Sequence, residues 1–146
     1  MTVHFREVTR DNLREVLHLK VAPEQERFVA SNAVSIAQAY FYRDQAWFRA
    51  LYAGDTPVGF LMLDDEPAKP RYTLWRFMID TRHQRKGFGR QALELLFGHV
   101  RTRPGATELY TSCVDAANGP GPFYEGLGFT YTGELDGSER VMRRPL

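Results

Sequence analysis

The sequence predicts one domain of mixed α/β class, in which strands and helices alternate along the chain. A chain of 146 residues corresponds to about one domain and can bury roughly 68–70% of its unfolded surface. Hydrophobic residues make up 43% and charged residues 25%, close to the globular average. The apolar spacing switches repeatedly between the strand and helix periods, which indicates alternating elements. With no linker or internal repeat, we expect a single domain over residues 1–146.

The N-terminal half begins with an expected strand at Val3–Val8, followed by a helix from a Thr9 cap to about Lys20. Pro23 suits a first helical residue, and a second helical segment, whole or broken, should reach about Arg43. Two apolar runs around Gly54 predict a hairpin of residues 47–63. Two prolines and three acids predict a loop from residue 64 to 70.

The C-terminal half contains the two most strongly patterned elements. Tyr72–Ile79 is strongly apolar, and we expect it to be the central strand, buried on both faces. Gly87–Arg101 is the clearest helix, and it places Leu93, Leu96, Phe97 and Val100 on one face. The remaining expected elements are a strand at 108–114, a short helix at 123–127 and strands at 129–133 and 140–144.

Cysteine, histidine and charge content exclude several classes of protein. The single cysteine, Cys113, rules out a disulfide framework and a multi-cysteine zinc site, and it fits a reducing, cytoplasmic setting. The four histidines lack metal-ligand spacing, so we expect no metal. The chain has no 18-residue apolar run, and its first residues lack a basic stretch followed by an apolar one, so we expect neither a secretory signal nor a membrane partner. A net charge of +1 is too weak for a nucleic-acid binder.

The segment Gln84–Arg90 falls between the central strand and the clear helix. Gly87 and Gly89 permit positive φ and close approach of a ligand. Free N–H groups and the helix dipole make this end attractive to a diphosphate. Arg82, Arg85, Lys86 and Arg90 add charge around it. Such a turn can also be purely structural, and it matches neither a Rossmann fingerprint nor a P-loop.

A second motif runs from Asn118 to Phe129 and is rich in glycine and proline. Gly128 suits a left-handed helix cap. A tyrosine on a short helix, here Tyr124, can present its hydroxyl to a cleft and donate a proton. Taken alone, a tyrosine serves packing more often than catalysis.

Together the two motifs resemble the GCN5-related N-acetyltransferase superfamily. Gln84-x-x-Gly87-x-Gly89 matches its acetyl-CoA motif, and Asn118, Tyr124 and Gly128-Phe129 follow its later motif in order and spacing. The resemblance covers about residues 72–133. It implies a mixed, mostly antiparallel sheet flanked by helices, acetyl-CoA as cosubstrate and, by analogy, pairing into a homodimer.

A finer resemblance lies in residues 21–40, 75–80 and Gln84, which look like bacterial spermine/spermidine or diamine acetyltransferases. It implies acetyl transfer to a primary amine of a small molecule, such as spermidine or spermine. Acetylation of a peptide, a protein or an antibiotic stays open. So does a non-catalytic acyl-CoA sensor, since a carboxylate that some relatives have on the central strand is missing here.

The resemblance also implies roles for single residues. The backbone of Phe77, Met78 and Ile79 would pair with the pantetheine arm, and an N–H near Met78 would stabilise the oxyanion. Tyr124 would protonate the departing thiolate. The remaining cofactor contacts implied are Gln84, Arg85, Lys86, Gly87, Phe88, Gly89, Arg90 and Asn118.

The general base has no clear candidate in the sequence. Tyr72–Ile79 contains no carboxylate, and Asp80 lies at its end. An amine with a pKa near 10 must lose a proton before it attacks. The candidates are Glu24, Glu26, Asp64 or a water relay, and Glu24 and Glu26 together are expected to recognise a cationic acceptor.

Overall fold

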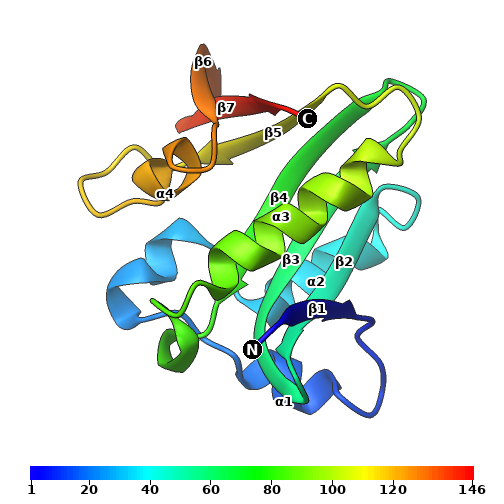
Figure 1. Cartoon of the computed structure of the whole chain (residues 1–146), viewed down its shortest axis with the longest axis vertical. Helices are drawn as coiled ribbons and strands as arrows, with labels where there is room; N and C mark the ends of the chain where they lie inside the picture. The colour runs from blue at the N-terminus through cyan, green and yellow to red at the C-terminus, as the bar shows by residue number, and fades with distance from the viewer.

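The computed structural model describes residues 1–146 as one seven-stranded sheet flanked by helices, shown in Figure 1. The strand order is β1-β2-β3-β4-β5-β7-β6, and every neighbouring pair is antiparallel except β4 and β5. The strands are β1 (Val3–Arg6), β2 (Ala46–Ala53), β3 (Thr56–Glu66), β4 (Arg71–Ile79), β5 (Glu108–Cys113), β6 (Thr130–Asp136) and β7 (Glu139–Pro145). The predicted mixed α/β class and mostly antiparallel sheet are confirmed.

The helices are short except for one. They are α1 (Leu13–His18), the 3₁₀ helix η1 (Pro23–Phe28), α2 (Asn32–Tyr40), the 3₁₀ turn η2 (Thr81–His83), α3 (Phe88–Arg101) and α4 (Gly121–Glu125). No helix combines the length and apolar character needed to cross a membrane. Ser31 caps α2 by accepting the Val34 N–H, so the second helical segment is broken into η1 and α2.

Two apolar cores lie on opposite faces of the sheet. One core joins the sheet to α3 and α4, with Leu93, Leu96 and Tyr124 among its members. The other joins the sheet to α1 and α2 through residues such as Val16 and Ala39. Figure 1 shows α3 running across one face of the sheet and α2 on the other face. Each helix therefore buries one apolar face against the sheet.

Two predicted boundaries are wrong. Residues 64–66 belong to β3, not to a loop, because Asp64 pairs with Thr73 and the neighbouring Asp65 carboxylate binds Arg103 at 3.0 Å. These partners let acids occupy the end of a strand. Thr9 does not cap a helix, since α1 begins at Leu13 and the Asn12 side chain accepts the Thr9 N–H at 2.7 Å.

The strand β4 occupies the centre of the sheet, as expected, but it is not buried on both faces along its length. Residues 75–77 are only half-buried. The cause is the short pairing of β4 with β5, which is limited to Thr73 with Tyr110 and Leu74 with Thr111. Beyond Leu74 the two strands separate, and the space between them becomes the main cavity of the molecule.

Candidate active site

The cavity between β4 and β5 has a volume of about 640 Å³, within the range of small-molecule sites. Four parts of the chain line it: η1 with the segment after it, the second half of β4, the loop leading into α3, and the region where β5, β7 and α4 meet. Apart from residues 21–30, which include η1, the cavity walls thus come from the second half of the chain.

The exposed edge of β4 forms one wall. After Leu74 no strand pairs with this edge, while the other edge of β4 remains paired with β3 up to Ile79. Phe77, Met78 and Ile79 all line the cavity. An unpaired strand edge presents N–H and C=O groups that an extended ligand with amide groups can join as an added strand.

The loop before α3 has an unusual backbone. Arg85 has φ 62° and Gly87, the N-cap of α3, has φ 82°. The first N–H groups of α3 have no intrahelical acceptor, and Gly87 has no side chain that could accept from them instead. A Cβ at Gly89 would lie 3.3 Å from the Phe123 ring, which leaves little room for a larger residue. The loop therefore offers free donors at the positive end of a helix, the arrangement that binds phosphate groups.

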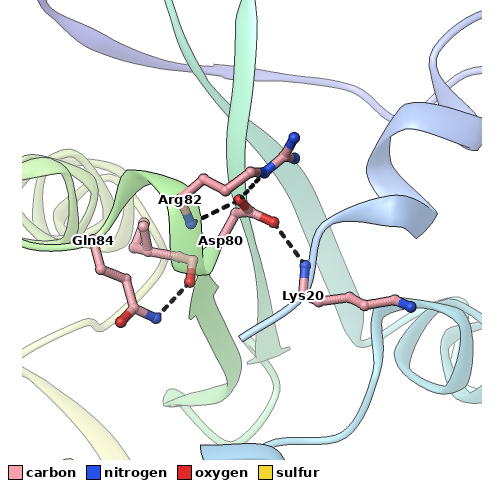
Figure 2. A network of polar contacts seen from close by, with 5 residues as sticks. Lys20, Asp80, Arg82 and Gln84 are labelled. Carbon is pink, nitrogen blue, oxygen red and sulfur yellow. Dashed lines mark hydrogen bonds and ion pairs between the residues drawn. The ribbon is translucent and has the colours of Figure 1, made fainter. Parts of the chain in front are cut away.

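A buried carboxylate holds the start of this loop in place, as Figure 2 shows. Asp80 is 2% exposed and accepts hydrogen bonds from the backbone N–H of Lys20 at 2.9 Å and from Nε of Arg82 at 2.8 Å. Burial alone would raise the pKa of the Asp80 carboxyl. The Arg82 side chain, with the Lys20 and Arg82 N–H groups, outweighs burial and holds the pKa below its usual value. All these donors bind Asp80 in place, and it does not line the cavity.

Gln84 connects the two sides of the cavity. Its amide nitrogen donates to the Ile79 carbonyl at 2.9 Å, at the end of β4. The same nitrogen donates to Oε1 of Gln25 at 2.8 Å, and the Gln25 amide returns a bond of 3.3 Å. Because Gln25 belongs to η1, this amide pair ties η1 to the loop before α3.

Tyr124 lies on α4 at the base of the cavity and is 6% exposed. Its ring packs edge-on against Phe123 and Phe129, with ring centroids 5.4 Å away in both pairs. Burial raises the pKa of the phenol far above its ordinary value, while a hydrogen bond with the Thr111 side chain opposes the shift. The hydroxyl is therefore protonated at neutral pH and can act as a hydrogen-bond donor.

Most of the predicted site residues meet at the cavity. The residues that line it are Phe77, Met78, Ile79, Gln84, Arg85, Gly87, Phe88, Gly89, Arg90, Asn118 and Tyr124. Lys86 is exposed and does not line it. Glu24 and Glu26 are also exposed on η1, although Gln25, between them, lines the cavity. Asp64 lies in β3, away from the cavity.

Among the lining residues that the sequence motifs missed is one acid, Glu139. It begins β7 and is the one carboxylate that lines the cavity. Oγ of Ser112, on β5, donates a hydrogen bond of 3.0 Å to Oε1 of Glu139. Neither residue belongs to a motif, and only the pairing of β5 with β7 brings them together. The structure has no group of three or more His, Cys, Asp or Glu side chains arranged to hold a metal ion.

Comparison with known sequences identifies relatives over the whole chain. The model of the acetyltransferase (GNAT) family matches residues 11–129. A spermine/spermidine N(1)-acetyltransferase of Bacillus subtilis is 31% identical, and the match covers 100% of both chains. A probable spermine N(1)-acetyltransferase of Bacillus subtilis subsp. natto is 30% identical over the same shares.

Solved structures share the fold. An acetyltransferase from Thermus thermophilus superposes with a TM-score of 0.78 at 25% identity, over 100% of this chain and 98% of the other. The PaiA N-acetyltransferase of Thermoplasma acidophilum, solved in complex with coenzyme A, has a TM-score of 0.71 at 17% identity, with both chains fully covered. The resemblance drawn from the two motifs is confirmed, and the chain belongs to the acetyltransferase (GNAT) family of acyltransferases.

Proposed function

We propose that the protein transfers the acetyl group of acetyl-CoA to a primary amine of a small molecule. The observation that carries this proposal is the unpaired edge of β4, which leads directly into the free N–H groups before α3. A pantetheine arm has amide groups to pair with such an edge, and a diphosphate fits the loop beyond it. In this arrangement Phe77, Met78 and Ile79 align the arm, and residues 84–90 with Asn118 surround the rest of the cosubstrate.

The reaction is a direct attack by a neutral amine on the thioester carbonyl. The N–C bond forms first, and a backbone N–H near Met78 stabilises the resulting oxyanion. The C–S bond then breaks, the nitrogen loses a proton, and the sulfur leaves as a thiolate that finally takes up a proton. Tyr124 supports the last step, because its phenol is protonated and faces the cavity.

The acceptor that we propose is a polyamine such as spermidine or spermine. The support comes from the two Bacillus relatives, which carry spermine acetyltransferase names and match the chain over its full length. Glu24 and Glu26 on η1 add negative charge outside the cavity. They would bind the distal ammonium groups of a long acceptor whose reacting end lies inside.

The test is release of free thiol from acetyl-CoA in the presence of spermine, spermidine, a monoamine, an aminoglycoside and a peptide with a free N-terminus. We expect the fastest turnover with the polyamines. Faster turnover with the peptide or the aminoglycoside would overturn the choice of acceptor. Calorimetric binding of CoA without turnover on any acceptor would instead favour a sensor, and no binding of CoA would overturn the whole proposal.

A further inference from the structure

We propose that Glu139 binds the reacting ammonium group of the acceptor and takes up the proton that the amine loses before attack. The inference rests on the proposed function and assigns a base to it. Central strand β4 offers no carboxylate, and Asp80 at its end is fully occupied by Lys20 and Arg82. Glu139 supplies the missing carboxylate from the other side of the cavity.

The geometry of Glu139 leaves one carboxylate oxygen available. Ser112 Oγ binds Oε1 at 3.0 Å, and no other hydrogen bond or ion pair engages the carboxylate. A hydroxyl that donates to one oxygen fixes the orientation of the carboxylate. The second oxygen is then free to accept a hydrogen bond from a ligand, and a positively charged donor makes the strongest such bond.

Glu139 is the single acidic group among several basic side chains of the cavity. The basic side chains lining the cavity are Arg27, Arg76, His83, Arg85 and Arg90, and the remaining titratable group is Tyr124. Arg76, on β4, interacts electrostatically with Glu139 but makes no ion pair with it. Its guanidinium instead donates to Oε1 of Gln38 at 2.8 Å and to the Trp75 carbonyl at 3.1 Å. Glu139 thus remains without a direct cationic partner inside the cavity, and an ammonium ligand would supply one.

Glu139 and Tyr124 lie beside two consecutive residues of β5, and both line the cavity. Successive residues of a strand face opposite ways. The Thr111 side chain lies close enough to lower the pKa of Tyr124, and the next residue, Ser112, hydrogen-bonds Glu139. In an acyl transfer the nucleophile adds to the carbonyl carbon, and the leaving group then departs from the same carbon as a separate substituent. The arrangement gives the incoming amine a carboxylate and the departing sulfur a phenol.

The proton transfer balances without a further reactant. An N–H bond of the ammonium group breaks, and its proton moves to the free oxygen of Glu139. The nitrogen keeps the electron pair and uses it to attack the acetyl carbon. Glu139 then passes the proton to water, which restores the carboxylate.

The test is Glu139→Gln, since the glutamine amide oxygen can still accept the Ser112 hydrogen bond. We expect kcat/KM for spermidine at pH 7 to fall about 100-fold, with the affinity for acetyl-CoA within twofold. An amine with a pKa near 10 is increasingly neutral as pH rises, so the deficit should shrink to less than about tenfold near pH 9.5. A purely structural role would give a deficit that is constant with pH.

The matched control is Glu134→Gln on β6, an exposed acid of the same hairpin, which should behave as wild type. If Glu139→Gln folds poorly, Ser112→Ala replaces it as the test, because it keeps the carboxylate but removes the hydrogen bond that orients it. A loss of kcat/KM smaller than about 100-fold, with an unchanged melting temperature, would support the proposal. Spermidine binding to the CoA-loaded protein is measured as well, by calorimetry. If the wild-type protein shows no turnover but Glu139→Gln binds spermidine more weakly, the ammonium site is supported and the proposed reaction is overturned. Equal binding, or a variant with wild-type kcat/KM, would overturn the role of Glu139.

Discussion

The two walls of the cavity are built in different ways. The wall proposed to hold acetyl-CoA runs continuously from β4 through the loop into α3, over residues 75–90, and it offers mainly backbone groups. The opposite wall combines η1, β5 and β7, and it offers side chains such as Gln25, Ser112 and Glu139. A constant cosubstrate suits a wall of backbone groups, whereas side chains that can vary suit recognition of a particular acceptor.

The largest expected effect comes from Tyr124, at which the two walls meet. Tyr124→Phe should lower kcat about 100-fold and change neither the CoA affinity nor the acceptor KM by more than threefold. The reason is that the phenyl ring preserves the packing against Phe123 and Phe129 while the donor is lost. Steady-state kinetics and calorimetry test this.

Tyr110→Phe on β5 is the control, because Tyr110 does not line the cavity.

Burial raises the pKa of Tyr124, so the phenol keeps its proton and wild-type activity should show no loss from its ionisation as pH rises to 10. An unchanged kcat in Tyr124→Phe would remove this residue from the chemistry.

A change confined to the backbone wall tests whether the walls are separable. Gly87→Val forces a β-branched residue into φ 82°, although its Cβ would meet no atom within 4 Å. Strain of about 1–3 kcal/mol should distort the loop and weaken CoA binding about 30-fold. Gly98→Val in α3 is the control, since its Cβ also has open space but its φ is not positive. Wild-type CoA affinity in Gly87→Val would contradict the diphosphate assignment.

The Asp80 carboxylate supports the backbone wall at the end of β4. Asp80→Asn should lower the free energy of unfolding by about 1–3 kcal/mol, because a buried acceptor of charged and backbone donors is weakened. The folded-state pKa of Asp80 is lowered, so its stabilisation is present above the unfolded pKa near 3.9 and is lost as pH falls below it. Urea unfolding of both proteins at pH 7 and pH 3 should therefore show a smaller difference at pH 3. A difference that grows on acidification would contradict this account.

The smallest effect is expected at the outer rim of the acceptor wall. The double variant Glu24→Gln/Glu26→Gln should raise KM for spermine about two- to threefold, since both carboxylates are exposed to solvent. KM for a monoamine should not change, because a short acceptor inside the cavity does not reach these two carboxylates outside it. Added salt should reduce the difference between variant and wild type. Equal effects on both amines would show that the pair does not bind distal charges.

The contrast between the walls also explains what the sequence could predict. Gln84, Gly87 and Gly89 are close together in the chain, and their backbone role depends on a local change from strand to helix. Reasoning from spacing therefore located the loop correctly. The same reasoning singled out Tyr124, which lines the cavity from a short helix between a glycine-rich loop and Gly128, where φ is 95°.

Glu139 could not be found in this way. Its position depends on β7 pairing with β5 and not only with its sequence neighbour β6. A single glutamate at the start of a strand has no local pattern that distinguishes it from a solvated one. The same limit applies to β4, whose apolar sequence predicts complete burial, whereas the separation of β5 after Leu74 leaves residues 75–77 half-buried.

The short ladder between β4 and β5 has a mechanical consequence. Only two residue pairs connect the strands on either side of the gap, so the terminal hairpin and α4 are joined to the rest mainly by side-chain packing. A pantetheine arm bound in this gap would form hydrogen bonds where β4 and β5 do not pair, and it would hold the two parts of the sheet together. Occupancy would then stiffen the whole molecule, and amide hydrogens of β5 and β7 would exchange more slowly in the loaded protein than in the empty one.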